Sequence, residues 1–418
     1  MKILCNFNMN MNSSLFSTIS LATVLSLILL ASSIFSNLSL HSVAFESKKH
    51  PPGFPPRNTH KQFRSSSSPK LLLSLKEEIQ EPYVRDPDPL LPPINVTVEE
   101  RIVWFKENLP EFKIIHSNGL TRKFASRAQE FFNGGCEVRF FMTWISPVRA
   151  FGYRELLTLE SVFKAHPFGC VMILSASMDS RQGSQLLKPL VDSGYRVAAV
   201  SPDLSFLFKN TPAESWFNEL KKGNVDPGEI PLAQNLSNLL RLAVLYKYGG
   251  VYLDTDVIVL KKFSALRNTI GAQAADENGN WNRLNNAVLV FDKEHPLIYK
   301  FIQEFALTFD GNKWGHNGPY LVSRVVSRIE KMPNYNFTVL LPIAFYPVDW
   351  IRISGFFRRP ENPAASKWVA AKLRQLSGET FAIHLWNRQS SSLKIEEGSV
   401  VGRLISYRCL FCKQSYSS

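Results

Sequence analysis

The sequence predicts an α/β fold with a largely parallel sheet, set behind an N-terminal extension of different composition. Between residues 134 and 260, short apolar stretches of strand length alternate with longer stretches of helical character. This alternation is typical of β-α-β units. Two carboxylates, Asp254 and Asp256, directly follow the apolar run 251–253. Because ligands of open α/β sheets bind beyond the carboxyl ends of strands, we expect the functional site there.

The first 130 residues lack this alternation and fall into three segments. Residues 15–40 are mostly apolar and uncharged, which suffices for a membrane-spanning helix, so we expect a signal anchor behind a cytosolic tail at 1–14. A cleaved signal peptide is the alternative for this stretch. Residues 41–130 are expected to be a stem and accessory region, with short helices within 71–91 and 96–112.

The chain carries a formal net charge of +13, and much of it lies in the stem. Residues 48–70 contain lysines and arginines but no acidic residue, together with several prolines and a serine run. Such a segment buries too little apolar surface to fold, so it is expected to be solvated and close to an anionic membrane surface. A basic chain can bind nucleic acid, but no zinc knuckle or interleaved aromatic residues accompany the charge. We therefore expect no nucleic-acid partner.

The globular domain is expected at 131–418, and its first half can be followed element by element. Strands are expected at 138–144, 171–174 and 196–200, and helices at 153–165, around 186–191 and around 216–220. A further helix is indicated by apolar residues at helical spacing, namely Leu236, Leu239, Leu240, Ala243 and Val244. Gly249 and Gly250 are expected to end it, because glycine adopts left-handed conformations at low cost. The apolar run 251–253 then suits a central strand.

The pair Asp254 and Asp256 has the chemistry of a cation site. Mg²⁺ and Mn²⁺ prefer oxygen ligands and are commonly held by one or two carboxylates together with substrate phosphate oxygens. An Asp-x-Asp at a strand end supplies carboxylate ligands on one side of the cation and leaves its other coordination positions to the oxygens of a diphosphate. A solvated turn is the alternative for an isolated Asp-x-Asp, but the buried-strand context favours a functional pair.

Four ordered segments resemble one known family. They are YKYGGVYLDTDVIVL at 246–260, WGHNGPYLVSRV at 314–325, LPIAFYPVDW at 341–350 and AIHLWN at 382–387. Over residues 136–412 the chain resembles the α1,4-glycosyltransferases (glycosyltransferase family 32, the group of the lactosylceramide 4-α-galactosyltransferases), and LYKYGG and GHNGPYL are similar to plant members. The resemblance implies a GT-A-type nucleotide-sugar-binding fold, a Rossmann-like mixed sheet that carries the Asp-x-Asp.

The resemblance also implies an activity and its partners. It implies a retaining, metal-dependent hexosyltransferase that uses Mn²⁺ or Mg²⁺ and a nucleotide-sugar donor, expected to be a UDP-sugar such as UDP-galactose. The acceptor would be a glycan or glycolipid, joined in α1,4 linkage. No carboxylate in the sequence clearly serves as a covalent nucleophile, so a same-face displacement is favoured. The expected location is the Golgi membrane, as a single-pass type II protein with a lumenal catalytic domain.

Site residues follow from the same resemblance. Asp254 is expected to contact the nucleotide and the metal, and Asp256 to ligate the metal. His384, at the end of an apolar run, is expected to be the third ligand, with a core histidine as the alternative. The other expected catalytic or substrate-binding residues are Asn238, Arg241, Tyr252, Asn285, Asn286, Trp314, His316 and Asn317.

Two of these assignments carry their own alternatives. Arg241 is expected to bind a sugar hydroxyl or a phosphate, with a structural salt bridge as the alternative. The family has Asp-x-x-Arg where this chain has Asn238-x-x-Arg241, which keeps hydrogen-bonding capacity but removes a charge. Asn285 and Asn286 are expected at a strand boundary, near the sugar or in a turn.

The cysteines fit a secretory compartment, because four of the five follow the expected anchor. Cys136 and Cys170 each lie beside an expected strand start and are candidates for a bridge, which would leave Cys409 and Cys412. Three pairings of these four remain open. Among the sequons, Asn95 is expected to carry a glycan.

Two other classes compete with the transferase interpretation. LDTDVIVL also fits a haloacid-dehalogenase-type phosphatase, which needs a downstream lysine and a further acidic pair; Asp292-Lys293 is the nearest approach. A non-catalytic lumenal glycan-binding protein is the second alternative. The presence of Asp254, Asp256 and His384 together argues against it.

Overall fold

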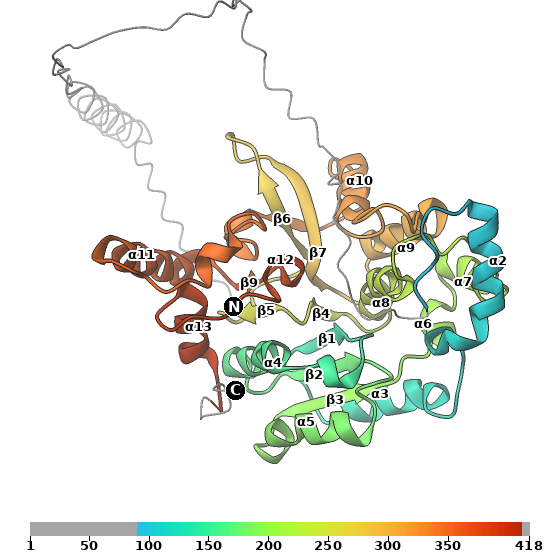
Figure 1. Ribbon diagram of the computed structural model, residues 1–418, viewed down its shortest axis with the longest axis horizontal. Coiled ribbons are helices and arrows are strands. Elements are labelled where there is room, and N and C mark those ends of the chain that lie inside the picture. The colour runs from blue at the N-terminus through green and yellow to red at the C-terminus, as the bar shows by residue number, and fades with distance from the viewer. Residues whose placement is uncertain (1–89, 412–418) are drawn as a thin grey trace, which may run out of the picture. The chain divides into compact units, whose positions relative to one another are not determined.

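The fold is built around a seven-stranded mixed sheet (Figure 1), and the computed structural model describes it over residues 90–411. The expected cytosolic tail, anchor and most of the stem lie outside the described residues. Within the described part of the chain, no helix is both long and apolar enough to cross a membrane.

The sheet has the strand order β3-β2-β1-β4-β7-β6-β8. Its strands are β1 (Arg139–Thr143), β2 (Cys170–Leu174), β3 (Arg196–Val200), β4 (Gly250–Leu253), β6 (Thr269–Ala275), β7 (Trp281–Phe291) and β8 (Thr338–Leu340). Strands β3, β2, β1 and β4 are parallel to one another, whereas β7 is antiparallel to both β4 and β6. A separate antiparallel ribbon joins β5 (Val257–Val259) to β9 (Ala382–His384).

Helices cover both faces of the sheet. They are α2 (Val98–Asn108), α3 (Phe124–Asn133), α4 (Tyr153–Ala165), α5 (Arg181–Asp192), α6 (Leu204–Phe208), α7 (Ala213–Lys221), α8 (Leu232–Tyr248), α9 (Pro296–Thr308), α10 (Pro319–Ile329), α11 (Pro363–Glu379), α12 (Asn387–Ser390) and α13 (Val400–Arg408). Because successive strand residues point to opposite faces, Phe141 and Met172 pack with α2, α3 and α6–α10. Phe140 and Val171 pack on the other face with α4, α5, α11 and α13.

The segment that leads to the expected site folds as its sequence predicts. The apolar residues of α8 are buried, and Gly249 ends the helix at φ 63°. A Cβ at Gly249 would lie 2.5 Å from the backbone nitrogen of Lys293, so a side chain there would collide with the neighbouring turn. The chain then enters β4, the fourth of seven strands, whose Val251, Tyr252 and Leu253 are almost fully buried.

The hydrophobic core extends further toward the N-terminus than residue 131, where the catalytic domain was expected to begin. Phe105 of α2 and Phe124 of α3 are fully buried in the same cluster as the residues of α8. Arg101 of α2 forms an ion pair with Asp226, at 2.6 Å between Nε and Oδ1. The helix expected within 96–112 is therefore part of the main fold.

Two further expectations can be compared with the structure. A disulfide joins Cys136 to Cys170, which is one of the three pairings that the sequence left open. Cys409 is also disulfide-bonded, and Cys412 lies outside the described residues.

Asn285 and Asn286 were expected at a strand boundary, but β7 begins at Trp281 and both lie inside the strand. Trp281 and Arg283 extend the strand because they pair with Ala275 and Ala274 of β6 across a register shift.

Candidate active site

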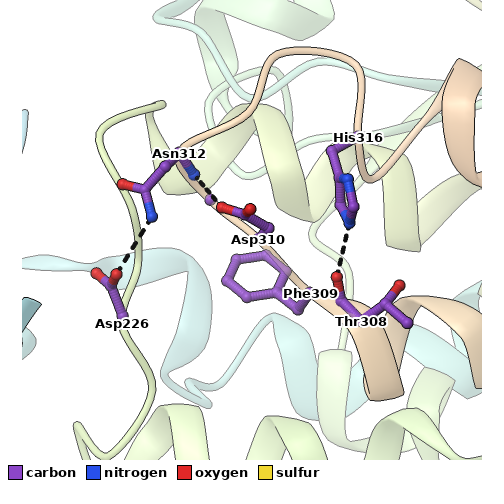
Figure 2. A pocket seen from close by; sticks show the side chains of 7 residues that line it. Asp226, Thr308, Phe309, Asp310, Asn312 and His316 are labelled. Carbon is purple, nitrogen blue, oxygen red and sulfur yellow. Dashed lines mark hydrogen bonds between the residues drawn. The ribbon is translucent and has the colours of Figure 1, made fainter.

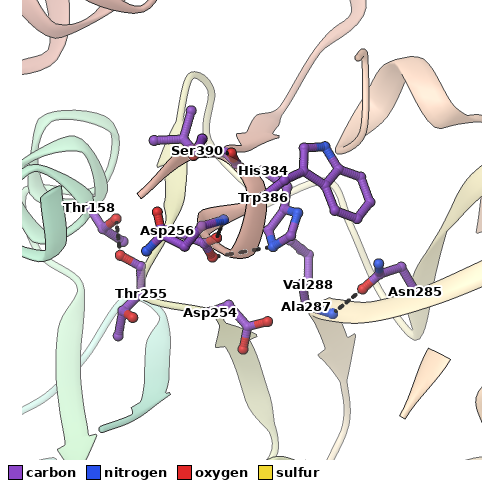
Figure 3. Close-up of polar contacts among 12 residues, drawn as sticks. Thr158, Asp254, Thr255, Asp256, Asn285, Ala287, Val288, His384, Trp386 and Ser390 are labelled. Carbon is purple, nitrogen blue, oxygen red and sulfur yellow. Dashed lines mark hydrogen bonds and ion pairs between the residues drawn. The ribbon is translucent and has the colours of Figure 1, made fainter. Parts of the chain in front are cut away.

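The carboxylates lie at the switch point of the sheet. The chain passes outward from β1 to β3 and then returns to place β4 on the other side of β1, so a crevice is expected at the carboxyl ends of β1 and β4. Asp254 and Asp256 follow β4 there. The β5–β9 ribbon pairs Val257 with His384, which brings the histidine beside Asp256 (Figure 3). One ligand atom from each of Asp254, Asp256 and His384 lies within 4.8 Å of the others.

Asp256 is held by the C-terminal segment. Its side chain accepts a hydrogen bond from the backbone N–H of Asn387 at 2.8 Å and faces His384 Nε2 at 3.2 Å. Trp386 adopts the left-handed conformation, φ 55°, and this turn directs the Asn387 N–H toward Asp256. Burial opposes ionisation of Asp256, but the neighbouring His384 and the Asn387 N–H outweigh it, so its pKa is lowered.

Asp254 is held by elements that precede it in the chain. Its Oδ1 accepts a hydrogen bond from the Tyr252 hydroxyl at 2.9 Å and lies 3.1 Å from Nη2 of Arg241. Tyr252 is fully buried, and its hydroxyl also contacts Thr143 Oγ1 at 2.7 Å. Burial and the nearby Asp256 charge raise the pKa of Asp254, although Arg241 opposes the shift. Asp254 keeps 27% of its side chain exposed, so one side remains accessible to a ligand.

Arg241 forms a buried ion pair with Asp254. Its side chain is 4% exposed, and it also donates to the carbonyl of Asn286 at 2.9 Å. Its guanidinium lies over the Tyr252 ring at 4.6 Å. The salt bridge that the sequence left open as the alternative is present, and Arg241 acts on the site through Asp254.

Asparagines connect α8 to the strands and loops around the site. Asn238 accepts a hydrogen bond from Asn286 Nδ2 at 2.9 Å, and both are buried. Asn285 donates to Gln273 of β6 at 2.9 Å. The amides of Asn285 and Asn286 thus lie next to the residues that hold Asp254, because Arg241 bonds the Asn286 carbonyl.

His384 has the environment of a metal ligand. It is 8% exposed, and its Nδ1 has no hydrogen-bond partner among residues 90–411. Its ring packs edge-on against Trp386, with centroids 4.4 Å apart. Burial disfavours protonation, but the charge of Asp256 outweighs it and raises the pKa of His384. Two carboxylates and an imidazole converging from buried or half-buried positions fit a divalent cation such as Mn²⁺ or Mg²⁺.

Trp314 connects a loop to the C-terminal side of the site. The Arg388 guanidinium lies 3.8 Å from the centroid of its ring. Arg388 belongs to α12, whose first residue donates its N–H to Asp256. Trp314 is 45% exposed, so part of its surface remains available to a ligand.

Within the described residues, no hydrogen bond joins His316 or Asn317 to the carboxylates. His316 Nε2 lies 2.8 Å from the carbonyl of Thr308, and His316 lines a different pocket of about 450 Å³ (Figure 2). Asn317 is buried and donates to Asn235 and to the carbonyl of Asp310, so it fixes the loop before α10 to α8. Both residues have structural contacts that the sequence pattern could not distinguish from substrate contacts.

Several contributors to the site were missed by the sequence. Thr143 supports Tyr252, and its position at the carboxyl end of an expected strand was the available signal. Thr158 donates to the carbonyl of Thr255, between the two aspartates, from the buried face of a helix (Figure 3). Asn387 contributes a backbone N–H, for which side-chain chemistry gives no signal.

The phosphatase alternative is not supported. Asp292 and Lys293 follow β7, which is antiparallel to β4 with Phe291 opposite Gly250. They therefore lie at the opposite end of the sheet from Asp254. Asp292 pairs instead with Arg267 at 2.8 Å.

Comparison with known proteins agrees with these observations. Residues 152–276 match a family model described as a glycosyltransferase sugar-binding region containing the DXD motif. Residues 290–416 match the model of the α1,4-glycosyltransferase conserved region. The first match includes Asp254 and Asp256, and the second includes His384.

Individual relatives extend over much of the chain. An uncharacterized Arabidopsis thaliana protein is 33% identical over 66% of this chain, which spans 42% of that protein. The human lactosylceramide 4-alpha-galactosyltransferase is 31% identical over 58% of this chain and 67% of its own length. Among solved structures, the PaToxG glycosyltransferase is 17% identical over 74% of this chain and 95% of its own, with a TM-score of 0.34. The chain is a glycosyltransferase, and it belongs to the α1,4-glycosyltransferase family.

Proposed function

We propose that this protein is a metal-dependent, retaining hexosyltransferase with a GT-A-type catalytic domain. The observation that carries the proposal is the convergence of Asp254, Asp256 and His384 within 4.8 Å at the carboxyl end of β4. Bound there, Mn²⁺ or Mg²⁺ would neutralise negative charge that develops on the leaving diphosphate. Asp256 and His384 would hold the cation, and the exposed side of Asp254 would face the nucleotide.

The donor is proposed to be a UDP-sugar, with UDP-galactose the first candidate. This choice is supported by the similarity to a lactosylceramide 4-alpha-galactosyltransferase. By the same similarity, the acceptor would be a glycolipid or another glycan, joined in α1,4 linkage. We propose that the amides of Asn285 and Asn286 contact sugar hydroxyls and that the exposed surface of Trp314 contacts a sugar face.

The transfer is proposed to occur on one face of the donor sugar. The anomeric carbon would lose its bond to the phosphate oxygen and gain a bond to the acceptor oxygen, while the acceptor proton passes to the leaving phosphate. The chain's contribution would be to orient both substrates and to exclude water. Isolation of a covalent glycosyl-enzyme adduct would overturn this proposal.

The location is proposed to be the Golgi membrane, in type II orientation. Residues 1–14 would be cytosolic and 15–40 the anchor, and the chain from residue 41 onward, including the folded domain that contains α2, would be lumenal. The disulfide between Cys136 and Cys170 supports an oxidising compartment. Protease protection of residues after 41 in intact microsomes, and loss of a glycan in Asn95→Gln, would test this topology.

The test of the proposed activity uses the whole chain and a panel of UDP- and GDP-sugars, with Mn²⁺ or with a chelator. Asp256→Asn keeps the side-chain shape but removes the charge that would hold the cation. We expect one nucleotide sugar to be hydrolysed or transferred in the presence of Mn²⁺ and not in the presence of the chelator. In Asp256→Asn, kcat/KM for that nucleotide sugar should fall by at least about 100-fold. Full activity in the chelator, or no turnover of any donor, would contradict the proposal.

A further inference from the structure

One face of α4 contacts each of the segments that form the carboxylate-histidine cluster. Arg154, Thr158 and Ser161 follow one another along α4 at spacings of four and three residues, so they share one side of the helix. Thr158 and Ser161 are fully buried. Each of the three makes a hydrogen bond outside its own helix.

Thr158 contacts the turn between the two aspartates. Its hydroxyl donates to the carbonyl of Thr255 at 2.7 Å (Figure 3). Thr255 separates Asp254 from Asp256, so the orientation of its peptide group affects the direction of both carboxylates. The Thr158 hydroxyl therefore restrains the backbone of the Asp-x-Asp itself.

Ser161 contacts the ribbon that carries His384. Its Oγ accepts a hydrogen bond from the backbone N–H of Val259 at 2.9 Å and donates to the carbonyl of Thr158 at 2.7 Å. Val259 lies in β5, which pairs with β9 so that Val257 is opposite His384. The distance between the ribbon and α4 is thus set by Ser161.

Arg154 contacts the turn that follows His384. Its guanidinium donates to the Leu393 carbonyl at 2.6 Å and to Ser390 Oγ at 3.1 Å. Ser390 is the last residue of α12, whose first residue, Asn387, donates its N–H to Asp256. Arg154 therefore holds the turn that orients Asp256.

We propose that Arg154, Thr158 and Ser161 are positioning residues that set the spacing of Asp254, Asp256 and His384 for cation binding. The proposal rests on the proposed metal dependence, and it states that α4 fixes the relative positions of the three metal-binding side chains. Asp256 and His384 lie 128 residues apart in the sequence. Residues of α4 form hydrogen bonds with the segment that carries Asp256 and with the segment that carries His384. Groups that orient metal ligands without touching the metal commonly change metal affinity by about 10- to 100-fold when removed.

Thr158→Val tests the proposal most cleanly, because valine keeps the branched shape and removes only the hydroxyl. Thr158→Ser retains the hydroxyl and serves as the rescue. Thr211→Val is the matched control, since Thr211 is a buried threonine whose hydroxyl donates to the nearby Phe208 carbonyl at 2.6 Å and accepts from the nearby Ala213 N–H at 3.3 Å. Mn²⁺ binding to the whole chain would be followed by electron paramagnetic resonance, which reports both the free ion and the symmetry of the bound one.

We expect Thr158→Val to weaken Mn²⁺ binding by about 10-fold and to change the spectrum of the bound ion. Thr158→Ser and Thr211→Val should bind Mn²⁺ as the wild type does, even where thermal stability falls. If Thr158→Val loses stability but keeps wild-type affinity and spectrum, the helix is only structural and the inference is wrong. If the wild type itself binds no Mn²⁺, the proposed metal dependence fails and the inference fails with it.

Discussion

The two carboxylates of the site are one residue apart, yet they are held by different parts of the molecule. Asp254 is bound by Arg241 and Tyr252, which come from the parallel half of the sheet and from α8. Asp256 is bound by His384 and the Asn387 N–H, which come from the C-terminal segment. One half of the site therefore forms with the parallel sheet, while the other half is complete only when the last fifth of the chain has folded against it.

This difference predicts that changes around Asp254 affect stability more, and changes around Asp256 affect metal binding more. The effects of Arg241 and Tyr252 should appear in the free energy of unfolding. The effects of His384 should appear in the dependence of activity on metal concentration. The following variants test that division.

The largest expected effect is that of Arg241→Met. Removing a buried arginine leaves the Asp254 carboxylate without its charged partner, which should lower the free energy of unfolding by about 3–5 kcal/mol. Urea denaturation would measure it. Arg267→Met is the matched control, because the Arg267–Asp292 pair is largely exposed and should contribute less than about 1 kcal/mol. Equal losses in the two variants would contradict the structural role of Arg241.

The next effect is that of His384→Gln. Glutamine retains a polar group of similar reach but lacks the imidazole nitrogen that would ligate the cation. We expect kcat/KM at limiting Mn²⁺ to fall by about 100-fold, with partial recovery at high Mn²⁺, and little change in unfolding free energy. A large loss of stability with unchanged metal dependence would instead indicate a core histidine.

Tyr252→Phe should have a smaller effect, on the side of Asp254. It removes the hydroxyl that donates to Asp254 and contacts Thr143 while preserving the buried ring. We expect a loss of about 1–3 kcal/mol in unfolding free energy, because buried polar groups lose their partner. Thr143→Val should show a loss of the same sign, and the double variant should cost less than the sum of the two. Strict additivity would show that the two hydroxyls do not act together.

The smallest expected effect is that of Trp314→Leu. It removes the ring on which Arg388 lies, an exposed cation–π contact worth about 0.5–1 kcal/mol. Stability should hardly change, whereas the KM for the acceptor should rise if Trp314 contacts the acceptor sugar. An unchanged KM for donor and acceptor would remove Trp314 from the substrate site.

The parallel half could be predicted from sequence because its pattern is local. The apolar spacing of α8, Gly249 and the run 251–253 each depend on neighbouring residues, and the structure confirms them. Asp254 and Asp256 could be located for the same reason. The link to His384 came from the family resemblance, since the β5–β9 pairing that brings it to Asp256 joins distant segments.

The rest of the site could not be predicted for physical reasons. Thr158 and Thr143 contribute single hydroxyls from elements whose relative packing is set by the whole core. Asn387 contributes its backbone, which every residue has. His316 and Asn317 were expected to bind substrate, and their hydrogen bonds in the structure go to backbone carbonyls and to the buried amide of Asn235. A polar residue beside glycines indicates a tight loop as readily as a binding site.

The metal site is tested by a Mn²⁺ titration of the whole chain, followed by electron paramagnetic resonance, for the wild type, Asp256→Asn and His384→Gln. We expect the wild type to bind one ion, UDP to strengthen its binding, and both substitutions to weaken it by at least about 10-fold. Wild-type affinity in both variants would contradict the assignment of Asp254, Asp256 and His384 as the metal site.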